Sequence, residues 1–544
     1  MTPNDGYILI ALCLIPLGIS LALFLVPTRQ RSSVQVITGL GSLVMFVLSV
    51  YVFQRYHFGG EQFQGVLAWN WMQHVGLLGD KGIQWKVGVD GIGASLVLLT
   101  GVVVVPATWV TWKIQDRMKD YFILLYLVTA GVYGSFVILD LFFWFLFYEM
   151  ALMPMYLLIG VWGSTRKEYG AMKLMMMLLA GSIFIFTVIF GLFTHVGAGT
   201  FDMVTLLNAP KDLWFQKAFF PLLVIGCGTL GAMFPFHSWS PDGHAAAPTS
   251  VSMLHAGVLM KVGAFGIIRL GIQILPEGAQ FWGPALITVG IVAALYGATS
   301  ALKQTDLKLM SGFSSVSHMG YVFLGLGTFN VIGWSGAILQ MTAHGWMTAL
   351  FFLLIGGMYD QSHNRDIPNF SGMAKQMPIW SIFFIFAAMA SLGLPGLSGF
   401  VAEVHSFIGT FRAYPIVGGL AVLTAAMCEG NKLQKVRDSF PDLFGPDWRR
   451  AAEHWSSVLG VGPFFVMEHV DGVVLERIGN VEASLPEAHR RETAESLVDT
   501  LVALHAVDPD AAHDALLHDD LALGATVHAA PHRRVLTLGV LAHD

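Results

Sequence analysis

Long apolar runs separated by short polar segments constrain this sequence more than any other feature. Hydrophobic residues make up 55% of the 544 positions and charged residues only 12%, about half the charged share of an ordinary soluble protein. A helix of about 20 apolar residues crosses the roughly 30 Å hydrocarbon core of a bilayer. The sequence therefore predicts an all-α polytopic membrane protein with about 12 complete spans. The runs lie near residues 6–27, 34–54, 90–112, 120–138, 140–163, 172–196, 215–234, 249–274, 281–301, 309–330, 336–358 and 377–411.

The apolar pattern stops before a thirteenth span is complete. The stub at 413–427 is too short to cross, and residues 428–544 are polar, rich in Asp, Glu, Arg and His, and contain no apolar run of spanning length. We therefore predict a transmembrane domain at 1–427. A small foreign tail of helical or mixed structure follows at 428–544, and we interpret it as a non-functional soluble fragment.

Basic residues indicate the orientation of the spans. They follow the odd-numbered runs, and segments rich in Lys and Arg stay in the cytoplasm. This pattern predicts that the N-terminus lies outside. The basic residues that carry it are Arg29, Arg31, Lys113, Arg117, Lys119, Arg166, Lys167, Lys303, Lys308, Arg365 and Lys375.

Two of the runs contain residues that interrupt a helix. The seventh leads into FPFHSWSPDGH, with Pro235 and Pro241, and the twelfth contains GLPGLSGF at 393–400. Non-helical backbone at membrane depth is tolerated only where it is buried in protein or lines a cavity. Interrupted helices in corresponding positions of two halves are typical of transporters built from inverted repeats. The sequence predicts such repeats, with an ion path at the two breaks.

A few ionisable residues lie inside the apolar runs. A lysine at the centre of a span costs about 2.5–3.5 kcal/mol on insertion scales, so Lys261 is expected to face the bundle interior rather than extend to the membrane surface. Two carboxylates, Glu149 and Glu403, and two histidines, His318 and His344, lie in other spans. Singly, each histidine could be a packed ring and each glutamate half of a structural ion pair. Together they predict a proton pathway.

The same sequence excludes several other functions. The three cysteines, Cys13, Cys227 and Cys428, are too far apart for a disulfide framework, a zinc site or an iron–sulfur run. We therefore expect no cofactor and no metal in this chain. No basic stripe with interleaved aromatic residues occurs, so we expect no nucleic-acid partner.

The chain from about 85 to 425 resembles the antiporter-like, proton-translocating subunits of respiratory complex I, NADH:quinone oxidoreductase. It is most similar to the type called subunit M, the bacterial counterpart of mitochondrial subunit 4. Glu403 supports this type, because subunits L and N usually carry lysine at that position. The matching motifs are VGVDGIG at 87–93, FYEMALMPMYLLIGVWG at 147–163, PFHSWSPDGHAAAPTSVSMLHAGVLMKVGAFG at 235–266, QTDLKLMSGFSSVSHMGYV at 304–322, MTAHG at 341–345 and LGLPGLSGFVAE at 392–403.

The resemblance implies a role for each intramembrane residue. Glu149 matches a fifth-helix glutamate whose charge state gates the unit, and Lys261 matches the central lysine that stores the proton. His318 and His344 match the relay histidines, and Glu403 matches the acid that leads to the outer side. Further members of the path are expected at His237, His255 and Lys308.

The resemblance also implies partners and a location. The chain would lie in the inner (cytoplasmic) membrane of a bacterium beside antiporter-like subunits of the L and N types. The flavin, iron–sulfur clusters and quinone would belong to partner subunits, so the chain would be part of an enzyme without redox chemistry of its own. A sodium/proton antiporter complex and a membrane-bound hydrogenase use the same motifs and stay open as alternatives.

One position departs from the family pattern. A lysine usually stands seven residues before the histidine of the PFHSW motif and pairs with the fifth-helix glutamate, whereas this chain has Leu230 there. His255 could replace it, although it lies about 240° round the helix from Lys261. A structural subunit that no longer pumps is therefore a further alternative.

The tail carries two weaker resemblances. The segments 462–478 and 495–509 resemble a fragment of aminoglycoside-phosphotransferase-like kinases, but the glycine-rich loop, the strand lysine and the catalytic aspartate loop are missing. We expect no kinase activity. Residues 451–465 also resemble the opening of a glyoxalase-type fold, and the metal ligands of that fold are not recognisable among His469, His505 and His513.

Overall fold

The computed structural model of this chain divides into two units, Met1–Leu443 and Phe444–Asp544. In the second unit the structure describes one antiparallel hairpin, β3 (Ala525–Ala530) with β4 (Arg533–Leu538). The structure describes residues 1, 3–72, 82–196, 199–370, 373–421, 525–530 and 533–538. The predicted domain boundary and the rest of the tail lie outside these residues.

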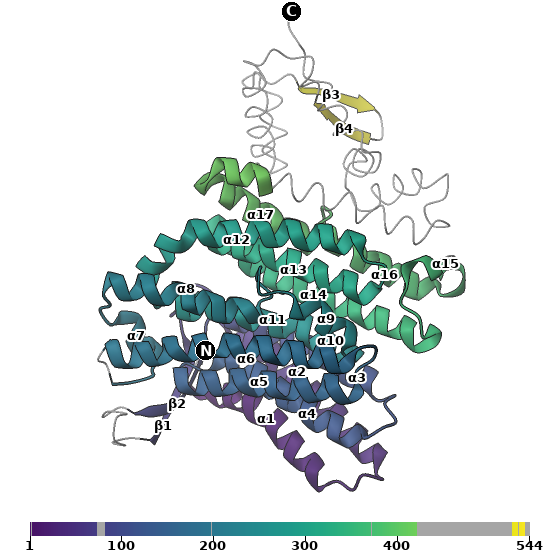
Figure 1. The fold of residues 1–544 in the computed structure, drawn as a ribbon, viewed down its shortest axis with the longest axis horizontal. Coiled ribbons are helices and arrows are strands. Elements are labelled where there is room, and N and C mark those ends of the chain that lie inside the picture. Colours follow the sequence, from purple (N-terminus) through teal and green to yellow (C-terminus); the bar gives the residue numbers. More distant parts are fainter. Residues whose placement is uncertain are drawn as a thin grey trace, which may run out of the picture. The chain divides into compact units, whose positions relative to one another are not determined.

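Each of the twelve predicted apolar runs forms a helix or a set of consecutive helical segments, which confirms the all-α multi-pass prediction (Figure 1). The helices that form the twelve runs are, in chain order, α1 (Gly6–Leu25), α2 (Arg31–Arg55), α3 (Gly91–Thr111), α4 (Met118–Val137), α5 (Leu141–Trp162), α6 (Lys167–His195), α8 (Leu213–Leu230), α10 to η4 (Thr249–Ile272), α12 (Pro276–Lys303), α13 (Leu307–Leu326), α14 (Val331–Ser362), and the pair α16 (Pro378–Ser391) and α17 (Ser398–Ala413). Among the described residues, ten segments are long and apolar enough to cross a membrane, and they are all of these except α13 and the pair α16–α17.

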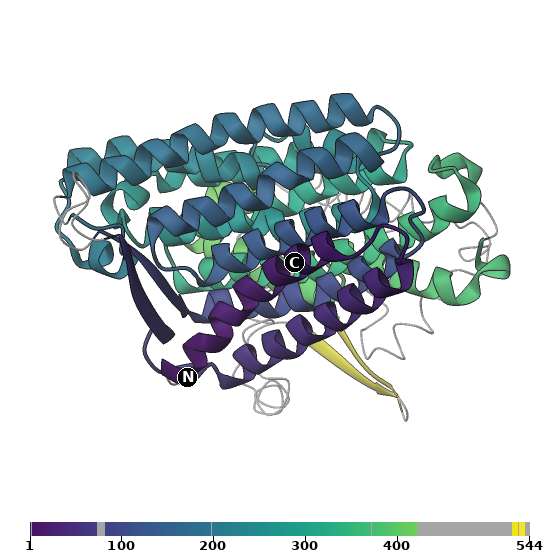
Figure 2. The same ribbon diagram turned by 90° about the horizontal axis from the view of Figure 1, so that it is seen from below.

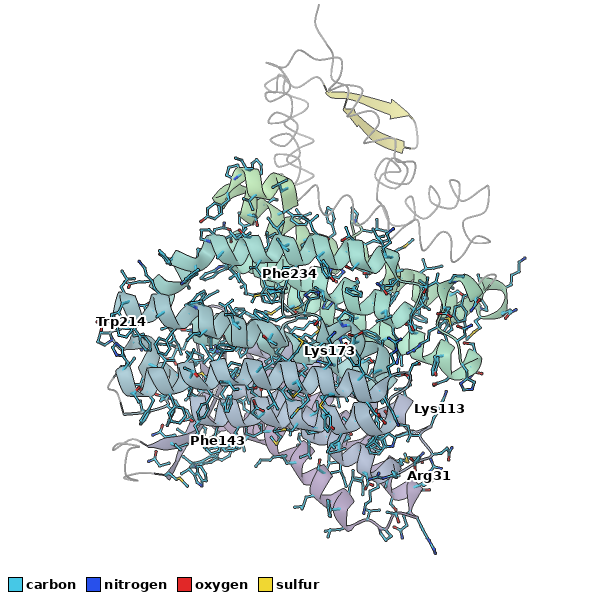
Figure 3. The ribbon with its side chains drawn as sticks, viewed as in Figure 1. Arg31, Lys113, Phe143, Lys173, Trp214 and Phe234 are labelled. Atoms are coloured by element: carbon cyan, nitrogen blue, oxygen red, sulfur yellow. The ribbon has the colours of Figure 1, made fainter. Side chains whose placement is uncertain are left out.

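The loops sort onto two opposite ends of the bundle. Loops that follow odd-numbered spans contact one another: Lys119 Nζ donates to the Val26 carbonyl at 3.0 Å, and Trp162 Nε1 donates to the Asp116 carbonyl at 2.9 Å. Figure 3 shows Arg31 and Lys113 at this end and Trp214 at the other. We call this end the basic face, made of residues 26–31, 112–119, 163–167, 303–308 and 363–367.

The end opposite the basic face carries a hairpin that the sequence analysis did not predict (Figure 2). Strand β1 (Gln64–Met72) pairs antiparallel with β2 (Ile83–Val89). The Leu139 N–H donates to the Lys86 carbonyl at 2.8 Å, and Lys86 Nζ lies 2.7 Å from a carboxylate oxygen of Asp202. These contacts join the hairpin to the start of α5 and to the short helix α7 (Met203–Asn208).

The same local structure occurs at both ends and supports the prediction of inverted repeats. Away from the basic face, Asp140 accepts hydrogen bonds from the first N–H groups of α5, and a β-bridge joins it to Asp202. At the basic face, Asp306 accepts from the first N–H groups of α13, and a β-bridge joins it to Asp366. The helix pairs α5–α6 and α13–α14 thus start from opposite faces with matching caps.

Both predicted helix breaks are present. Helix α8 ends at Leu230 and the chain becomes helical again at α9 (Trp239–Ala246). Helix α16 ends at Ser391 and α17 begins at Ser398. The second break requires glycine, because Gly393 and Gly396 have φ angles of 64° and 94°, which L-residues with a side chain rarely adopt.

Helices α12 and α13 approach each other through glycines. A Cβ atom on Gly320 would lie 2.5 Å from the Ala294 nitrogen, and one on Gly290 would lie 2.6 Å from the Leu324 nitrogen. Small residues let membrane helices pack closely, and here the close approach fixes the helix that carries His318.

Gly320→Leu is expected to prevent this packing. The side chain would collide with backbone atoms that cannot move independently, so we expect a destabilisation of about 3 kcal/mol, the upper part of the range for overpacked sites. The measurement is the amount of chain retained in the membrane and the melting temperature of the purified complex. Gly18→Leu is the matched control, since a Cβ there meets no atom within 4 Å. Equal retention of both variants would contradict the prediction.

The VGVDGIG motif forms a buried ion pair. Asp90 caps α3 by accepting from the Gly93 N–H at 2.7 Å, and its carboxylate lies 2.8 Å from Arg269 Nη2. The Arg269 guanidinium also lies over the rings of Phe63 and Phe265. Asp90 therefore ties α3 to η4 (Ile267–Ile272), the end of the span that contains Lys261.

Asp90→Ala is expected to destabilise the chain by about 3–5 kcal/mol, because it leaves a buried guanidinium without its counter-charge. Asp90→Asn keeps an acceptor for the Gly93 N–H and removes only the charge, so it separates the ion pair from the cap. Thermal unfolding of the purified complex is the measurement. A loss for alanine that asparagine fully restores would assign the effect to the cap alone.

Candidate functional site

Lys261 lies in the interior of the bundle. Its side chain is fully buried, as are all residues of α11 (Met260–Gly266). The Nζ atom donates to the Ala256 carbonyl and lies 2.7 Å from His344 Nδ1. The amine is thus held at mid-helix by one carbonyl and one imidazole, and it does not extend to the membrane surface.

A π-helical turn directly before α11 leaves a backbone carbonyl free to accept from the Lys261 side chain. Residues His255–Leu259 form a π-helical turn, η3, directly before α11. The Met260 N–H bonds to the His255 carbonyl, five residues back, so the Ala256 carbonyl loses the donor that a regular α-helix would supply. The Lys261 side chain bonds to that carbonyl. π-Helical turns occur frequently at functional sites.

Two buried histidines follow Lys261 in space, the first in contact with its amine and the second in contact with the first. His344 lies in α14 and His318 in α13, and each is 1% exposed. Their ring centroids are 5.1 Å apart. His344 is therefore the histidine next to the lysine, and His318 lies beyond it.

Glu403 of α17 ends this series. Its Oε1 lies 3.2 Å from His318 Nδ1. Gln340 of α14 donates from Nε2 towards both groups, at 3.0 Å to His318 Nδ1 and 3.4 Å to Glu403 Oε1. We call Lys261, His344, His318 and Glu403, with Gln340 beside the last two, the central file.

The geometry around His318 allows two hydrogen-bonding states. When Nδ1 carries a proton, it donates to Glu403, and the Gln340 amide donates to the carboxylate. When Nδ1 is deprotonated, it accepts from Gln340 instead. The same contacts therefore serve both protonation states. The other ring nitrogen of His318, Nε2, lies 3.4 Å from Ser391 Oγ at the second helix break.

A second buried group extends from Lys308, at the basic face, to His255, which lies in the π-helical turn before Lys261. Lys308 of α13 donates from Nζ to the Ala247 carbonyl at 2.6 Å. His244 of α9 packs against His255, with ring centroids 4.8 Å apart. His255 also stacks on Trp239 at 4.9 Å. We call Lys308, His244 and His255 the uptake group. All three side chains are buried.

The structure does not bring His237 into either group. Its ring stacks on Phe234 and contacts Tyr296 of α12. Within the described residues, its Nδ1 atom is buried without a hydrogen-bond partner. His237 therefore lies at the first break, between α8 and α12.

Glu149 has a different environment from the one that the family pattern implies. Leu230, at the usual lysine position, is fully buried at the end of α8. The polar side chain that interacts with the Glu149 carboxyl group is Ser182 of α6, and Oε1 is buried without a hydrogen bond to any described residue. His255 packs against Trp239 and His244 and makes no such contact with Glu149 among the described residues.

Sequence reasoning missed two members of the site. His244 was visible in the SPDGH segment, and its spacing from His255 across Pro248 gave no sign that the rings would meet. Gln340 was passed over because it is uncharged, although it lies four residues before His344 and therefore on the same face of α14. A search for any polar residue one helical turn from a buried histidine would have found it.

The arrangement can move protons along a defined line. Amine, imidazole and carboxyl groups lie within hydrogen-bonding or ring-contact distance of their neighbours, and the four side chains of the file are buried. The break between α16 and α17 lies beside its far end. Side chains of these types can take up and donate protons.

The family model for "NADH:quinone oxidoreductase/Mrp antiporter, TM" matches residues 139–428. The chain belongs to this family. The match covers the central file, the uptake group and both helix breaks. The model of a phosphotransferase enzyme family matches residues 441–537, in the region of the tail where the sequence resembles a kinase fragment.

Similar curated proteins of the NADH:quinone oxidoreductase/Mrp antiporter family carry the name NAD(P)H-quinone oxidoreductase chain 4. The protein of Gloeobacter violaceus is 37% identical over 422 residues, which cover 77% of this chain and 78% of that protein. The protein of Synechococcus elongatus is 37% identical over 411 residues, which cover 75% and 76%.

Solved structures of this family have the same fold. A chain of respiratory complex I from Thermus thermophilus aligns with a TM-score of 0.72 and 25% identity, over 79% of this chain and 88% of that chain. A chain of the Mrp complex from Dietzia aligns with a TM-score of 0.68 and 22% identity, over 81% and 80%. Both of these neighbours were solved as chains of larger complexes.

Proposed function

We propose that this chain is a proton-translocating membrane subunit of an NAD(P)H:quinone oxidoreductase. The observation that carries the proposal is the central file, in which Lys261, His344, His318 and Glu403 lie in contact across the buried middle of the bundle. The names of the relatives, NAD(P)H-quinone oxidoreductase chain 4, support the reaction class.

Proton transfer would follow the order of the side chains. Quinone reduction in partner subunits changes the charge near Glu149, and protonation of Glu149 changes the proton affinity of Lys261. The Lys261 ammonium then donates from Nζ to His344 Nδ1, and the proton passes by way of the His318 ring to Glu403. Glu403 releases it on the side away from the basic face, and the uptake group supplies Lys261 with the next proton.

This function requires partners that hold the redox groups. We propose that antiporter-like subunits of the L and N types flank the chain and that flavin, iron–sulfur clusters and quinone belong to other subunits. The basic face would lie in the bacterial cytoplasm, and the N-terminus would lie outside, because cytoplasmic loops are enriched in Lys and Arg.

We further propose that the transmembrane domain ends near residue 427 and that 428–544 is a foreign tail without catalytic function. Two facts support this division. The match to the antiporter family ends at residue 428, and the phosphotransferase match begins at residue 441. The kinase motifs named above are missing from the sequence of the tail.

Affinity purification of the full chain from its native membrane tests the proposal. We expect quinone-reducing subunits to copurify, and the complex in sealed vesicles to acidify one side during quinone reduction. Copurification with hydrogenase subunits, or with sodium/proton antiporter subunits and no quinone reductase, would contradict it.

A second candidate, a structural subunit that does not pump, is favoured by the environment of Glu149. Leu230 takes the place of the usual lysine, and one carboxylate oxygen lacks a hydrogen-bond partner in the described structure. If Lys261→Ala leaves the number of protons moved per quinone unchanged in the assembled complex, this candidate replaces the first.

A further inference from the structure

The carbonyl end of α9 is held by hydrogen-bond donors from both halves of the bundle, a backbone N–H from the first half and two side chains from the second. The last carbonyls of a helix have no partner within the helix. Here the Ala245 carbonyl accepts from Arg365 Nη1 at 2.7 Å, the Ala246 carbonyl accepts from the Ser164 N–H at 2.7 Å, and the Ala247 carbonyl accepts from Lys308 Nζ at 2.6 Å. Two of the three donors are cations, which are favoured at the negative end of a helix.

Arg365 links three separate elements. Besides Ala245, its guanidinium donates from Nη2 to Thr165 Oγ1 at 3.1 Å, and its Nε lies 3.2 Å from a carboxylate oxygen of Asp306. Thr165 follows α5 in the first repeat, and Asp306 caps α13 in the second. The side chain is 9% exposed. The rigid fork of an arginine can make all these contacts at once, whereas a lysine cannot.

The position of α9 determines the position of the uptake group. His244 precedes Ala245 in α9, and its ring lies against that of His255. Lys308 bonds to the Ala247 carbonyl at the end of the same helix. If the carbonyl end of α9 moved away from α13, His244 would leave His255 and Lys308 would lose its acceptor.

We propose that Arg365 is a positioning residue for proton uptake, which holds α9 at the basic face so that Lys308, His244 and His255 stay in line with Lys261. This inference rests on the proposed function. Arg365 does not itself carry a proton, and its contribution is the placement of α9 between the two repeats.

The test uses the assembled complex with Arg365→Gln, Arg365→Lys and, as a matched control, Arg166→Gln, an exposed arginine on the same face. Hydrogen–deuterium exchange is measured for the peptide that covers α9, and protons translocated per quinone reduced are measured in sealed vesicles. For Arg365→Gln we expect exchange in α9 at least 10-fold faster than in the unaltered complex. We also expect its coupling ratio to fall to that of Lys261→Met while quinone reduction continues. In both measurements Arg365→Lys should give values between those of Arg365→Gln and the unaltered complex, and Arg166→Gln should match the unaltered complex.

Unchanged exchange in α9, or faster exchange with an unchanged coupling ratio, would overturn the inference. If Arg365→Gln is lost from the complex, Thr165→Val provides the second variant, since it removes one acceptor of the guanidinium. It should speed exchange in α9 by about 2- to 3-fold, and no change would overturn the inference.

The number of protons translocated per quinone separates this inference from the proposed function. If this number is normal in Arg365→Gln but lowered in Lys261→Met, only the role of Arg365 is refuted. Normal ratios in both would refute the proposed function.

Discussion

Lys261→Met is expected to abolish the proton translocation that passes through this chain while quinone reduction by the complex continues. Methionine has nearly the length of lysine and fills the same buried space, but it has no proton to donate to His344 Nδ1. The measurement is the initial rate of vesicle acidification divided by the rate of quinone reduction.

Lys303→Met is the control for Lys261→Met. Lys303 lies at the end of α12, is exposed, and belongs to neither the central file nor the uptake group. Its replacement should leave the ratio unchanged. A Lys261→Met complex that pumps with the full ratio would show that the amine is a structural group.

Glu403→Gln is the prediction with the second largest effect. Glutamine preserves the size of the side chain and a carbonyl acceptor for His318 and Gln340, but it does not take up a proton at neutral pH. A single positioned acid–base group contributes about 100- to 10,000-fold to a proton-transfer rate, so transfer through the file should slow by at least about 100-fold.

Glu168→Gln is the matched control for Glu403→Gln, because Glu168 lies exposed in the first turn of α6 at the basic face. We expect a normal ratio in Glu168→Gln. Retention of more than half of the unaltered pumping rate through this unit in Glu403→Gln would mean that protons leave by another route.

The spans and the breaks were predictable because their causes are local. The length of an apolar run decides whether a helix can cross a bilayer. Pro235, Gly393 and Gly396 lie in the two breaks, whereas Pro241 lies inside the first turn of α9 and does not interrupt it. Asp140 and Asp306 cap their helices through N–H groups two and three residues away, and such contacts are also local.

The order of the central file was not predictable from the sequence. Both relay histidines were singled out, but the sequence order, with His318 first, is the reverse of the spatial order that starts at Lys261. That order depends on how α13 and α14 pack, through contacts such as the close approach of Gly325 in α13 to Gly333 in α14, and such packing is not visible in the sequence pattern of either helix alone. The π-helical turn before Lys261 was also not predicted, because no residue in His255–Leu259 requires it.

The hairpin β1–β2 was missed for a different reason. The segment 64–89 has no long apolar run, so a reading based on membrane spans assigned it no element. Its pairing depends on contacts with Leu139 and Asp202 at the ends of other helices. Strand propensity alone is a weak guide when the strands gain their stability from such contacts.

The most direct test of the account compares Lys261→Met, Glu403→Gln and the double variant in one vesicle assay that counts protons translocated per quinone reduced. Side chains that act in series are not additive, because removal of any one of them stops the whole path. We predict that both single variants and the double variant lose the same number of protons per quinone. A double variant that loses the sum of two different single losses would contradict the account, since the lysine and the glutamate would then belong to separate routes.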